Sequence, residues 1–293
     1  MGISPYPSTV TPPDVPQPYP SIMEFLVARF PRVPRARWEQ RIAAGKVLDE
    51  AGCPITMESG YVPLKRLFYF REVEQERVIP FQEEILFRND DILVACKPHF
   101  LPVTPGGAYV NECLLNRLRR RADIDYLAPI HRIDRATAGI VMFSVNKKTS
   151  DLYHALFRDG KVEKRYEALS PCTHHQEENE WLVENRIVTG EPWFRMTTVP
   201  GEVNARSRIT LAEVRSGMGR FELSPFTGQT HQLRLHMSGL GFGILNDRLY
   251  PDLQPEVADD FAKPLQLIAR MLGFRDPVTG NLMTFVSGRT LIW

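Results

Sequence analysis

The stretch that says most about this chain of 293 residues is His131-Arg132-Ile133-Asp134-Arg135-Ala136-Thr137-Ala138-Gly139. It places one carboxylate, Asp134, between two arginines, just before an apolar run at residues 140–143 that predicts a buried strand. Nearby positive charge favours the charged form of a carboxyl group, so we expect Asp134 to be ionised. An ionised carboxylate there can be a nucleophile or a base, and the arginines beside it can bind phosphate. A turn residue among solvated arginines is the alternative, because aspartate is common in turns.

The composition is typical of a soluble globular protein, with 43% hydrophobic and 24% charged residues. A formal net charge of +1 gives no bulk polycationic character that would by itself indicate a nucleic-acid partner. Basic residues gather locally, with six between Arg29 and Lys46 against the single acidic Glu39, and four arginines within residues 117–121. Such clusters attract polyanions, but solvated faces have the same pattern, so they do not decide the partner.

The four cysteines (Cys53, Cys96, Cys113 and Cys172) have neither the spacing of a zinc site nor that of a disulfide framework. We therefore expect buried, reduced thiols and no metal. The proline-rich start lacks the regions of a signal peptide, and no apolar run reaches the length of a membrane span. These observations predict a soluble protein of a reducing compartment, most simply the cytoplasm.

The composition also divides the chain into three parts. Residues 1–20 hold seven prolines and one charged residue, so we expect a flexible or extended tail that buries no core. Residues 21–75 show helical spacing and then short strand-like pieces, which predicts a small basic α/β module with a boundary near residues 73–80. Residues 81–293 form a longer, mostly strand-like domain.

This third part predicts an α+β domain with a mixed, mainly antiparallel sheet, because strands and helices interleave without a regular βαβ repeat. Helical patterns cover residues 111–121, 148–158 and 230–238. Strand-like runs lie at residues 139–145, 164–169, 265–272 and 282–286, and residues 85–95 and 206–225 each predict a hairpin with a turn at 89–91 and 216–219. The last of the three helices puts His231 and Arg234 on one face.

Three further segments put polar groups beside apolar strand or helix residues, as the Asp134 stretch does. They are Lys164-Arg165-Tyr166, Phe226-Thr227-Gly228-Gln229-Thr230-His231-Gln232-Leu233-Arg234-Leu235-His236, and Leu245-Asn246-Asp247-Arg248-Leu249-Tyr250. Each has a structural interpretation when it is taken alone. A strand tyrosine is usually a packing residue, and His231 and His236 lack the i, i+4 spacing of a helical metal pair.

Together and in this order, the four segments resemble the RluA-like family of RNA pseudouridine synthases. That family has His-Arg-Leu-Asp…Thr-Ser-Gly-Leu around its catalytic aspartate, then Lys-x-Tyr, then Thr-Gly-Arg-Thr-His-Gln-Ile-Arg-x-His, and then Leu-Gly-Asp…Tyr. The hairpin that ends at Lys97-Pro98 is also similar to the segment that opens the family's catalytic domain, and the match runs from about residue 83 to residue 287. The resemblance implies the fold and the activity of a pseudouridine synthase.

The resemblance also implies roles for individual residues. Asp134 is expected to be the catalytic nucleophile or acid–base group, and Arg234 to pair with the aspartate. Tyr166 is expected to stack on the target base, with participation in proton transfer as a further role. Arg132 is expected to fill the space that a flipped uridine leaves in the RNA. Further RNA contacts are expected from residues of the same motifs: His131, Thr137, Lys164, Gln229 and His231.

Four positions depart from the family pattern. Gln229 stands where arginine is usual, Ala138 where serine is usual, Asn246 where glycine is usual, and Ile268 where a histidine is common. None of them is one of the four residues with an implied role, so the departures bear on the substrate and on the support of the site more than on the reaction.

The basic module at residues 21–75 has a second resemblance, to a degenerate version of the small alpha-L RNA-binding module that often precedes these catalytic domains. The usual asparagine-glycine turn is missing, and Asp49-Glu50-Ala51-Gly52 stands in that region. A plain helical cap on the catalytic domain is the alternative.

We therefore expect an isomerase that converts uridine to pseudouridine in ribosomal or transfer RNA, with RNA as its partner, acting as a monomer. The chemistry needs neither redox chemistry nor a group donor, so no cofactor is expected. A carboxylate can attack the sugar or the base, and the base must leave the RNA stack to be reached. Two alternatives remain, a non-catalytic RNA-binding or RNA-folding protein and a glycoside or nucleoside hydrolase, which generally needs two carboxyl groups.

Overall fold

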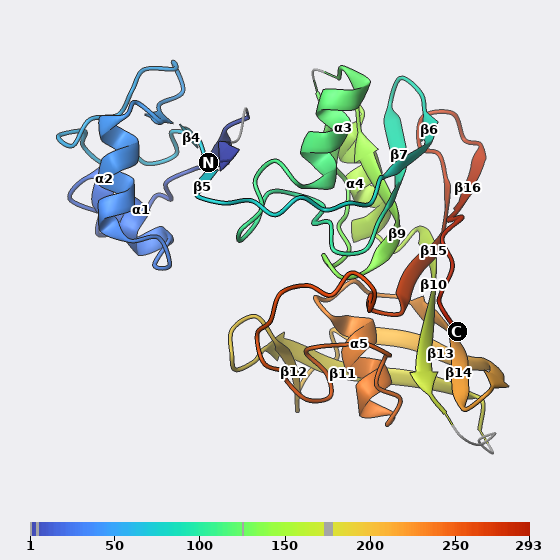
Figure 1. Ribbon diagram of the computed structural model, residues 1–293. Helices are drawn as coiled ribbons and strands as arrows, with labels where there is room; N and C mark the ends of the chain where they lie inside the picture. Colours follow the sequence, from blue (N-terminus) through green and yellow to red (C-terminus); the bar gives the residue numbers. More distant parts are fainter. Residues whose placement is uncertain (1, 4–5, 125, 173–177) are drawn as a thin grey trace. The chain divides into compact units, whose positions relative to one another are not determined.

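The computed structural model describes residues 2–3, 6–124, 126–172 and 178–293 (Figure 1). The chain forms two compact units, the smaller from Met1–Arg77 and Gly106–Asn111, and the larger from Val78–Pro105 and Glu112–Trp293. The segment Gly106–Asn111, which was assigned by sequence to the long domain, thus belongs to the smaller unit.

In the smaller unit, helices α1 (Ile22–Arg29) and α2 (Arg35–Ala43) pack over a short sheet, with Phe25, Leu26 and Trp38 in the core. Ser21 caps α1, because its hydroxyl accepts a hydrogen bond from the Glu24 N–H at 3.2 Å. The sheet has the order β2-β4-β3, and a separate pair joins β1 to β5. Their bounds are β1 Gly2–Ile3, β2 Ser8–Val10, β3 Val47–Leu48, β4 Leu67–Tyr69 and β5 Glu72–Val73.

The prediction of a tail without core contacts at residues 1–20 is wrong for the part that includes Ser8–Val10 and Tyr19. We expected an extended or flexible tail without core contacts, but Ser8–Val10 pairs with Leu67–Tyr69, and Val10 and Tyr19 pack against the core of the smaller unit. The ring of Tyr19 lies 5.5 Å from that of Phe25. The composition predicted no core contacts, but the side chains of Val10 and Tyr19 and one three-residue strand pairing are enough to attach the extended segment to the sheet.

Much of the basic charge of the smaller unit is paired within it. Arg35 contacts Glu24 at 2.7 Å, Arg37 contacts Glu74 at 2.9 Å, and Lys46 contacts Glu72 at 2.6 Å. The buried Arg41 lies over the ring of Trp38 at 4.8 Å. The six basic residues at 29–46 therefore form a less uniformly positive surface than their density in the sequence indicates.

The larger unit is built on one sheet of eleven strands among the described residues. Their bounds are β6 Glu84–Arg88, β7 Ile92–Lys97, β8 Ala128–Pro129, β9 Ala138–Ser144, β10 Val162–Pro171, β11 Glu180–Thr189, β12 Met196–Val199, β13 Ala205–Arg215, β14 Met218–Pro225, β15 Leu267–Arg275 and β16 Leu282–Val286. The order is β12-β11-β13-β14-β10-β15-β9-β7-β6, with β16 beside β15 and β8 beside β9. Only β9 and β15 are parallel neighbours, so the predicted α+β fold with a mixed, mainly antiparallel sheet is confirmed.

Gly139 makes the parallel contact between β9 and β15 possible. It pairs with Ala269 in register and has a φ of +114°, which side chains rarely allow. A Cβ atom at this position would lie 2.2 Å from the carbonyl oxygen of Ala269. The glycine that ends the motif around Asp134 is therefore required where the two halves of the sheet join.

Helices cover the two halves of this sheet (Figure 1). Helix α4 (Ser150–Arg158) packs through Tyr153 and Leu156 on β7 and β9, and helix α5 (Gln232–Gly239) packs through Leu233 and Met237 on β13 and β14. Helix α3 is Leu114–Ala122. All three are present where helices were predicted, and each begins two or three residues later than expected.

Strands β11 and β12 were not predicted from the sequence. Strand β11 alternates exposed and half-buried positions, and of its residues only Ile187 is buried. Such a strand carries charges on one face and little continuous apolar character, so its pattern is weak.

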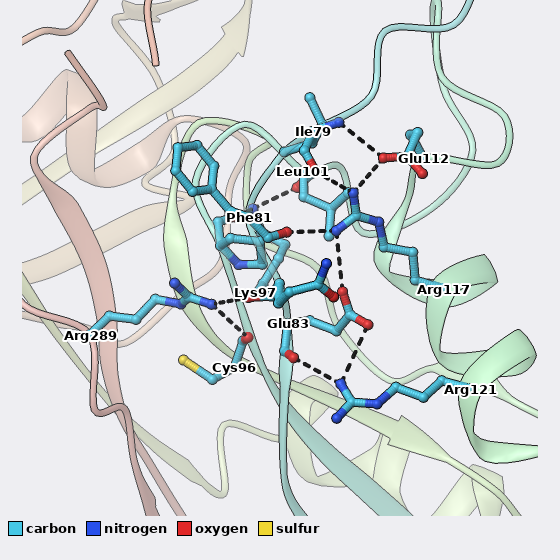
Figure 2. Close-up of polar contacts among 12 residues, drawn as sticks. Ile79, Phe81, Glu83, Cys96, Lys97, Leu101, Glu112, Arg117, Arg121 and Arg289 are labelled. Carbon is cyan, nitrogen blue, oxygen red and sulfur yellow. Dashed lines mark hydrogen bonds and ion pairs between the residues drawn. The ribbon is translucent and has the colours of Figure 1, made fainter. Parts of the chain in front are cut away.

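Two arginines of the cluster at residues 117–121, Arg117 and Arg121, bind the segment that precedes β6 (Figure 2). Arg117 donates to the carbonyl oxygens of Ile79 at 2.6 Å and Phe81 at 2.7 Å, and it pairs with the buried Glu83 at 3.3 Å. Arg121 donates to the carbonyl oxygen of Glu83 at 3.0 Å. These contacts tie α3 to the irregular segment that leads into β6, and they give the buried carboxylate of Glu83 its compensating charge.

Candidate active site

A cavity of about 560 Å³ opens between the loop before β9, helix α4, strand β10 and the loop from β14 to α5. The structure brings together all nine residues that the sequence singled out. They are Asp134, Tyr166, Arg234, Arg132, His131, Thr137, Lys164, Gln229 and His231.

Asp134 faces a buried guanidinium group inside the cavity. Arg234 on α5 donates from Nη1 to Asp134 Oδ2 at 3.2 Å. The same guanidinium binds Asp247 through two hydrogen bonds, from Nε at 2.7 Å and from Nη2 at 2.6 Å. Burial lowers the pKa of Arg234, but the hydrogen bonds and charges of Asp247 and Asp134 raise it more, so this pKa lies above its ordinary value. The cation beside Asp134 is therefore permanent.

The two arginines next to Asp134 in the sequence do not pair with it, which corrects the expectation from adjacency. Arg135 binds Asp259 through two hydrogen bonds of 2.8 and 2.9 Å. Arg132 is exposed and makes no hydrogen bond or ion pair with any residue in the described part of the chain. The charge that faces Asp134 comes instead from Arg234, 100 positions away.

A turn and a buried lysine hold the loop of Asp134. The N–H of Thr137 donates to the carbonyl oxygen of Asp134 at 3.2 Å. Lys97, fully buried at the end of β7, donates to the carbonyl oxygens of Arg135 at 3.1 Å and Leu101 at 2.6 Å. Burial lowers the pKa of Lys97 well below its ordinary value. This lysine fixes the backbone next to Asp134, and a lysine at the end of an otherwise apolar strand is the signal that marks it in the sequence.

Tyr166 on β10 is half-buried in the wall of the cavity. The register between β10 and β15 shifts between Arg165 and Tyr166, and such bulges redirect side chains. Burial raises the pKa of Tyr166 above its ordinary range, and the charge of Asp134 raises it further. Its hydroxyl therefore keeps its proton, and its ring is available for contact with a base.

His131 and Lys164 also line the cavity. The Nε2 atom of His131 accepts a hydrogen bond from the Met142 N–H at 3.1 Å, and its ring stacks on Phe157 at 4.5 Å. Burial and then the charge of Lys164 lower the pKa of His131 to about 3, so this ring is neutral. Lys164 donates to the carbonyl oxygen of Thr227 at 3.0 Å, which joins β10 to the loop before α5.

The loop before α5 holds Gln229 and His231 by different contacts. The side chain of Gln229 donates to the carbonyl oxygen of Asn204 at 3.2 Å. His231 immediately precedes the helix with a φ of 56°, and its Nδ1 lies 2.9 Å from the hydroxyl of Tyr250. Its Nε2 lies 3.8 Å from Asp134 Oδ2, so His231 is the second group that faces the same carboxylate oxygen.

Two supporting residues, Asp247 and Tyr250, were not among the predicted site residues. The side chain of Asp247 is 0% exposed and anchors Arg234, and Tyr250 contacts His231. Both lie in the segment 245–250 that the sequence had singled out, so the motif that contains them is the signal that could have identified them.

The structure also gives physical reasons for three departures from the family pattern. Asn246 has a φ of 64°, a conformation that asparagine tolerates better than most residues, so it can stand where glycine is usual. Its side chain donates to the carbonyl oxygen of Pro264 at 3.0 Å. Ala138 and Ile268 are partners in register and lie in one apolar cluster, so both departures replace polar residues at a single contact.

No group of three or more histidine, cysteine, aspartate or glutamate residues in the described ranges is arranged to hold a metal ion. Among the helices that the structure describes, none is long and apolar enough to cross a membrane.

Known proteins that are similar to this chain identify its family. The pattern of the family described as RNA pseudouridylate synthase matches residues 91–239. The chain is 30% identical over 206 residues to the dual-specificity RNA pseudouridine synthase RluA of Haemophilus influenzae, which covers 69% of this chain and 91% of the relative. It is 33% identical over 205 residues to the RluA of Salmonella typhimurium, and this match covers 69% of this chain and 90% of that relative. The solved structure of human RNA pseudouridylate synthase domain containing 1 has the same fold, with a TM-score of 0.58 at 22% identity over 73% of this chain and 86% of that one. The chain therefore belongs to the RluA-like family of RNA pseudouridine synthases and is a pseudouridine synthase, an isomerase that acts within a single substrate molecule.

Proposed function

We propose that this enzyme isomerises uridine in structured ribosomal or transfer RNA, with Asp134 as the catalytic carboxylate. The observation that carries this proposal is the placement of Asp134 in the cavity, beside the permanent cation of Arg234. Tyr166 lines the same cavity. The bacterial relatives are described as dual-specificity RNA pseudouridine synthases, which supports an RNA substrate.

The reaction requires a group like Asp134. The bond from C1′ of the ribose to N1 of uracil breaks, the base rotates, and a bond from C1′ to C5 forms, while C5 loses a proton and N1 gains one. A carboxylate can attack the sugar or the base, or assist the loss of a sugar proton, and each of these roles needs the ionised form. The hydrogen bond from Arg234 to Oδ2 orients the group.

The cavity also suits a nucleotide that has left the RNA stack. The neutral ring of Tyr166 offers a platform for the uracil, and aromatic rings are common partners of unstacked bases. Arg132 at the rim is exposed, so it is available to occupy the gap that the flipped uridine leaves. Lys164 and Arg158 add positive charge to the cavity lining, which favours the phosphate backbone.

A hydrolase of the two-carboxylate type does not suit this geometry. Such enzymes need carboxyl groups on both sides of the bond that breaks. Asp247 is the only other carboxylate near Asp134 in the matching motifs, and its side chain is 0% exposed and bound to Arg234 through both oxygens. It does not line the cavity.

The decisive experiment compares Asp134→Asn with the wild-type enzyme on unmodified transcripts of ribosomal and transfer RNA. The amide removes the charge with little change of shape, so we expect RNA binding to persist and pseudouridine, detected by carbodiimide adducts, to disappear. Asp90→Asn at an exposed turn is the matched control and keeps full activity. Undiminished product from Asp134→Asn would contradict the proposal, and a wild-type enzyme that modifies neither RNA class would contradict the proposed substrate.

A further inference from the structure

Tyr250 and His231 form a hydrogen-bonded pair, and the imidazole of His231 lies between the hydroxyl of Tyr250 and the carboxylate of Asp134. The hydroxyl oxygen of Tyr250 accepts the N–H of Met196 at 2.7 Å and lies 2.9 Å from His231 Nδ1. Tyr250 is buried, with 3% of its surface exposed. The pair therefore links Met196 of strand β12 to His231 at the start of α5, and His231 is the residue that faces Asp134.

The distances indicate where the protons of this pair lie. The O–H of Tyr250 has two acceptors within reach, His231 Nδ1 at 2.9 Å and the carbonyl oxygen of Met196 at 3.3 Å. The shorter distance favours donation to His231. A neutral imidazole that accepts at Nδ1 carries its proton on Nε2. That atom lies 3.8 Å from Asp134 Oδ2, so an N–H, and not a lone pair, faces the carboxylate.

Both groups that face Asp134 act on the same oxygen. Arg234 donates to Oδ2 at 3.2 Å, and His231 Nε2 faces Oδ2 as well. Oδ1 of Asp134 has no hydrogen-bond partner in the described part of the chain. We propose that Tyr250 fixes the tautomer of His231 so that its Nε2–H, together with Arg234, holds Oδ2 of Asp134 and leaves Oδ1 as the oxygen that reacts with the nucleotide.

Tyr250 and His231 are thus positioning residues, and this inference rests on the proposed role of Asp134. The separation of 3.8 Å exceeds a hydrogen bond, and such contacts often shorten only when substrate binds. Burial lowers the pKa of His231, and the charged groups around it are Asp134, Arg234 and Asp247. A neutral imidazole is therefore the form that faces the carboxylate.

The first test removes only the hydroxyl group. Tyr250→Phe keeps the ring over which the guanidinium groups of Arg195 and Arg234 lie at 5.1 and 5.3 Å. We expect the single-turnover rate constant at saturating enzyme to fall about tenfold, the order for one lost hydrogen bond, with RNA affinity unchanged. Tyr153→Phe is the matched control, since Tyr153 is equally buried and its hydroxyl bonds Asp276 at 3.1 Å outside the cavity. That control keeps the wild-type rate constant.

A second readout does not depend on activity. In protein labelled with 15N-histidine, NMR distinguishes a protonated ring nitrogen from an unprotonated one, and loss of a signal in His231→Gln assigns His231. We expect a protonated Nε2 and an unprotonated Nδ1 in the wild type, and a loss of this preference in Tyr250→Phe. A protonated Nδ1 in the wild type, or an unchanged tautomer or rate constant in Tyr250→Phe, overturns the inference.

A third comparison separates positioning from backbone strain. His231 has a left-handed φ of 56°, which asparagine tolerates better than glutamine, so a purely structural role predicts that His231→Asn is the more active variant. The amide of glutamine reaches the position of Nε2, whereas that of asparagine reaches only Nδ1. Our inference therefore predicts that His231→Gln retains more activity, and the reverse order contradicts it. If Asp134→Asn is inactive while these variants behave as the wild type, only the positioning inference fails; if Asp134→Asn is active, the proposed function fails.

Discussion

Arg234 and Asp247 are joined by two hydrogen bonds of 2.7 and 2.6 Å, and their side chains are only 5% and 0% exposed. This pair sets the direction of the third guanidinium nitrogen, which reaches Asp134 at 3.2 Å. Asp247 also accepts the N–H groups of Leu249 and Tyr250 at 2.8 and 3.2 Å. The position of the cation at the active site is thus fixed by a carboxylate that does not line the cavity.

Asp247→Asn should therefore lower both activity and stability. The amide cannot accept both guanidinium hydrogen bonds, and it leaves a buried charge without its main partner, which costs about 3 kcal/mol of the free energy of unfolding. We expect the rate constant of isomerisation to fall about 100-fold, since Arg234 is displaced from Asp134. Urea denaturation and single-turnover kinetics measure the two effects. Asp252→Asn, at an exposed position, is the control, and a stable, fully active Asp247→Asn would show that Arg234 needs no anchor.

Gly139→Ala should disrupt the centre of the sheet. Its Cβ would meet the carbonyl oxygen of Ala269 at 2.2 Å, and the φ of +114° is itself unfavourable for alanine. We expect a loss of about 3 kcal/mol or more in the free energy of unfolding, or no soluble protein. Gly280→Ala is the matched control, because its φ is +75° but nothing lies within 4 Å of the added Cβ. It should cost about 1 kcal/mol. Equal losses in the two variants would show that the contact with Ala269 has no part in the effect.

The order of the motifs was enough to predict which nine side chains lie around one cavity, because three of the four motifs contribute residues to its lining. The partner of Asp134 could not be predicted from its neighbours. Arg132 and Arg135 lie within two positions of Asp134, yet Arg135 binds Asp259 and Arg132 makes no ion pair with Asp134 in the described part of the chain. The contact with Arg234 exists only once β9 and α5 are folded.

The parts of the fold that escaped prediction share a physical cause, which is a weak local signal. Strand β11 buries few side chains and carries charges at alternate positions, so only its pairing with β13 makes it a strand. Asn246 stood in the sequence only as a departure at a usual glycine, and its φ of 64° gives that departure a backbone reason. Ala138 and Ile268 stood as separate departures in the sequence, and they became one contact in the parallel register of β9 and β15.

Tyr166 should contribute mainly through its ring. Its hydroxyl remains protonated because burial, and then the charge of Asp134, raises its pKa. Tyr166→Phe should therefore retain wild-type RNA affinity, whereas Tyr166→Ala should lose about tenfold or more, the range for one stacked base. Fluorescence anisotropy at a fixed salt concentration measures both. Similar affinities for Phe and Ala would mean that no base stacks on this ring.

Histidines that stay neutral in the fold should make the larger unit sensitive to acid, and His131 offers the clearest case. Burial and the charge of Lys164 lower its pKa from 6.5 to about 3. The unfolded chain then binds a proton as the pH falls below 6.5 while the folded chain does not, so stability is unaffected above that pH and is lost progressively between about 6.5 and about 3. His131→Gln removes this proton, and an amide oxygen can still accept the N–H of Met142. The slope of unfolding free energy against pH between 6 and 4 should become shallower by about 1.4 kcal/mol per pH unit in this variant, measured by urea denaturation. His154→Gln, at an exposed position of α4, is the control and should keep the wild-type slope. A wild-type slope in His131→Gln would show that the His131 ring takes up its proton in the folded protein.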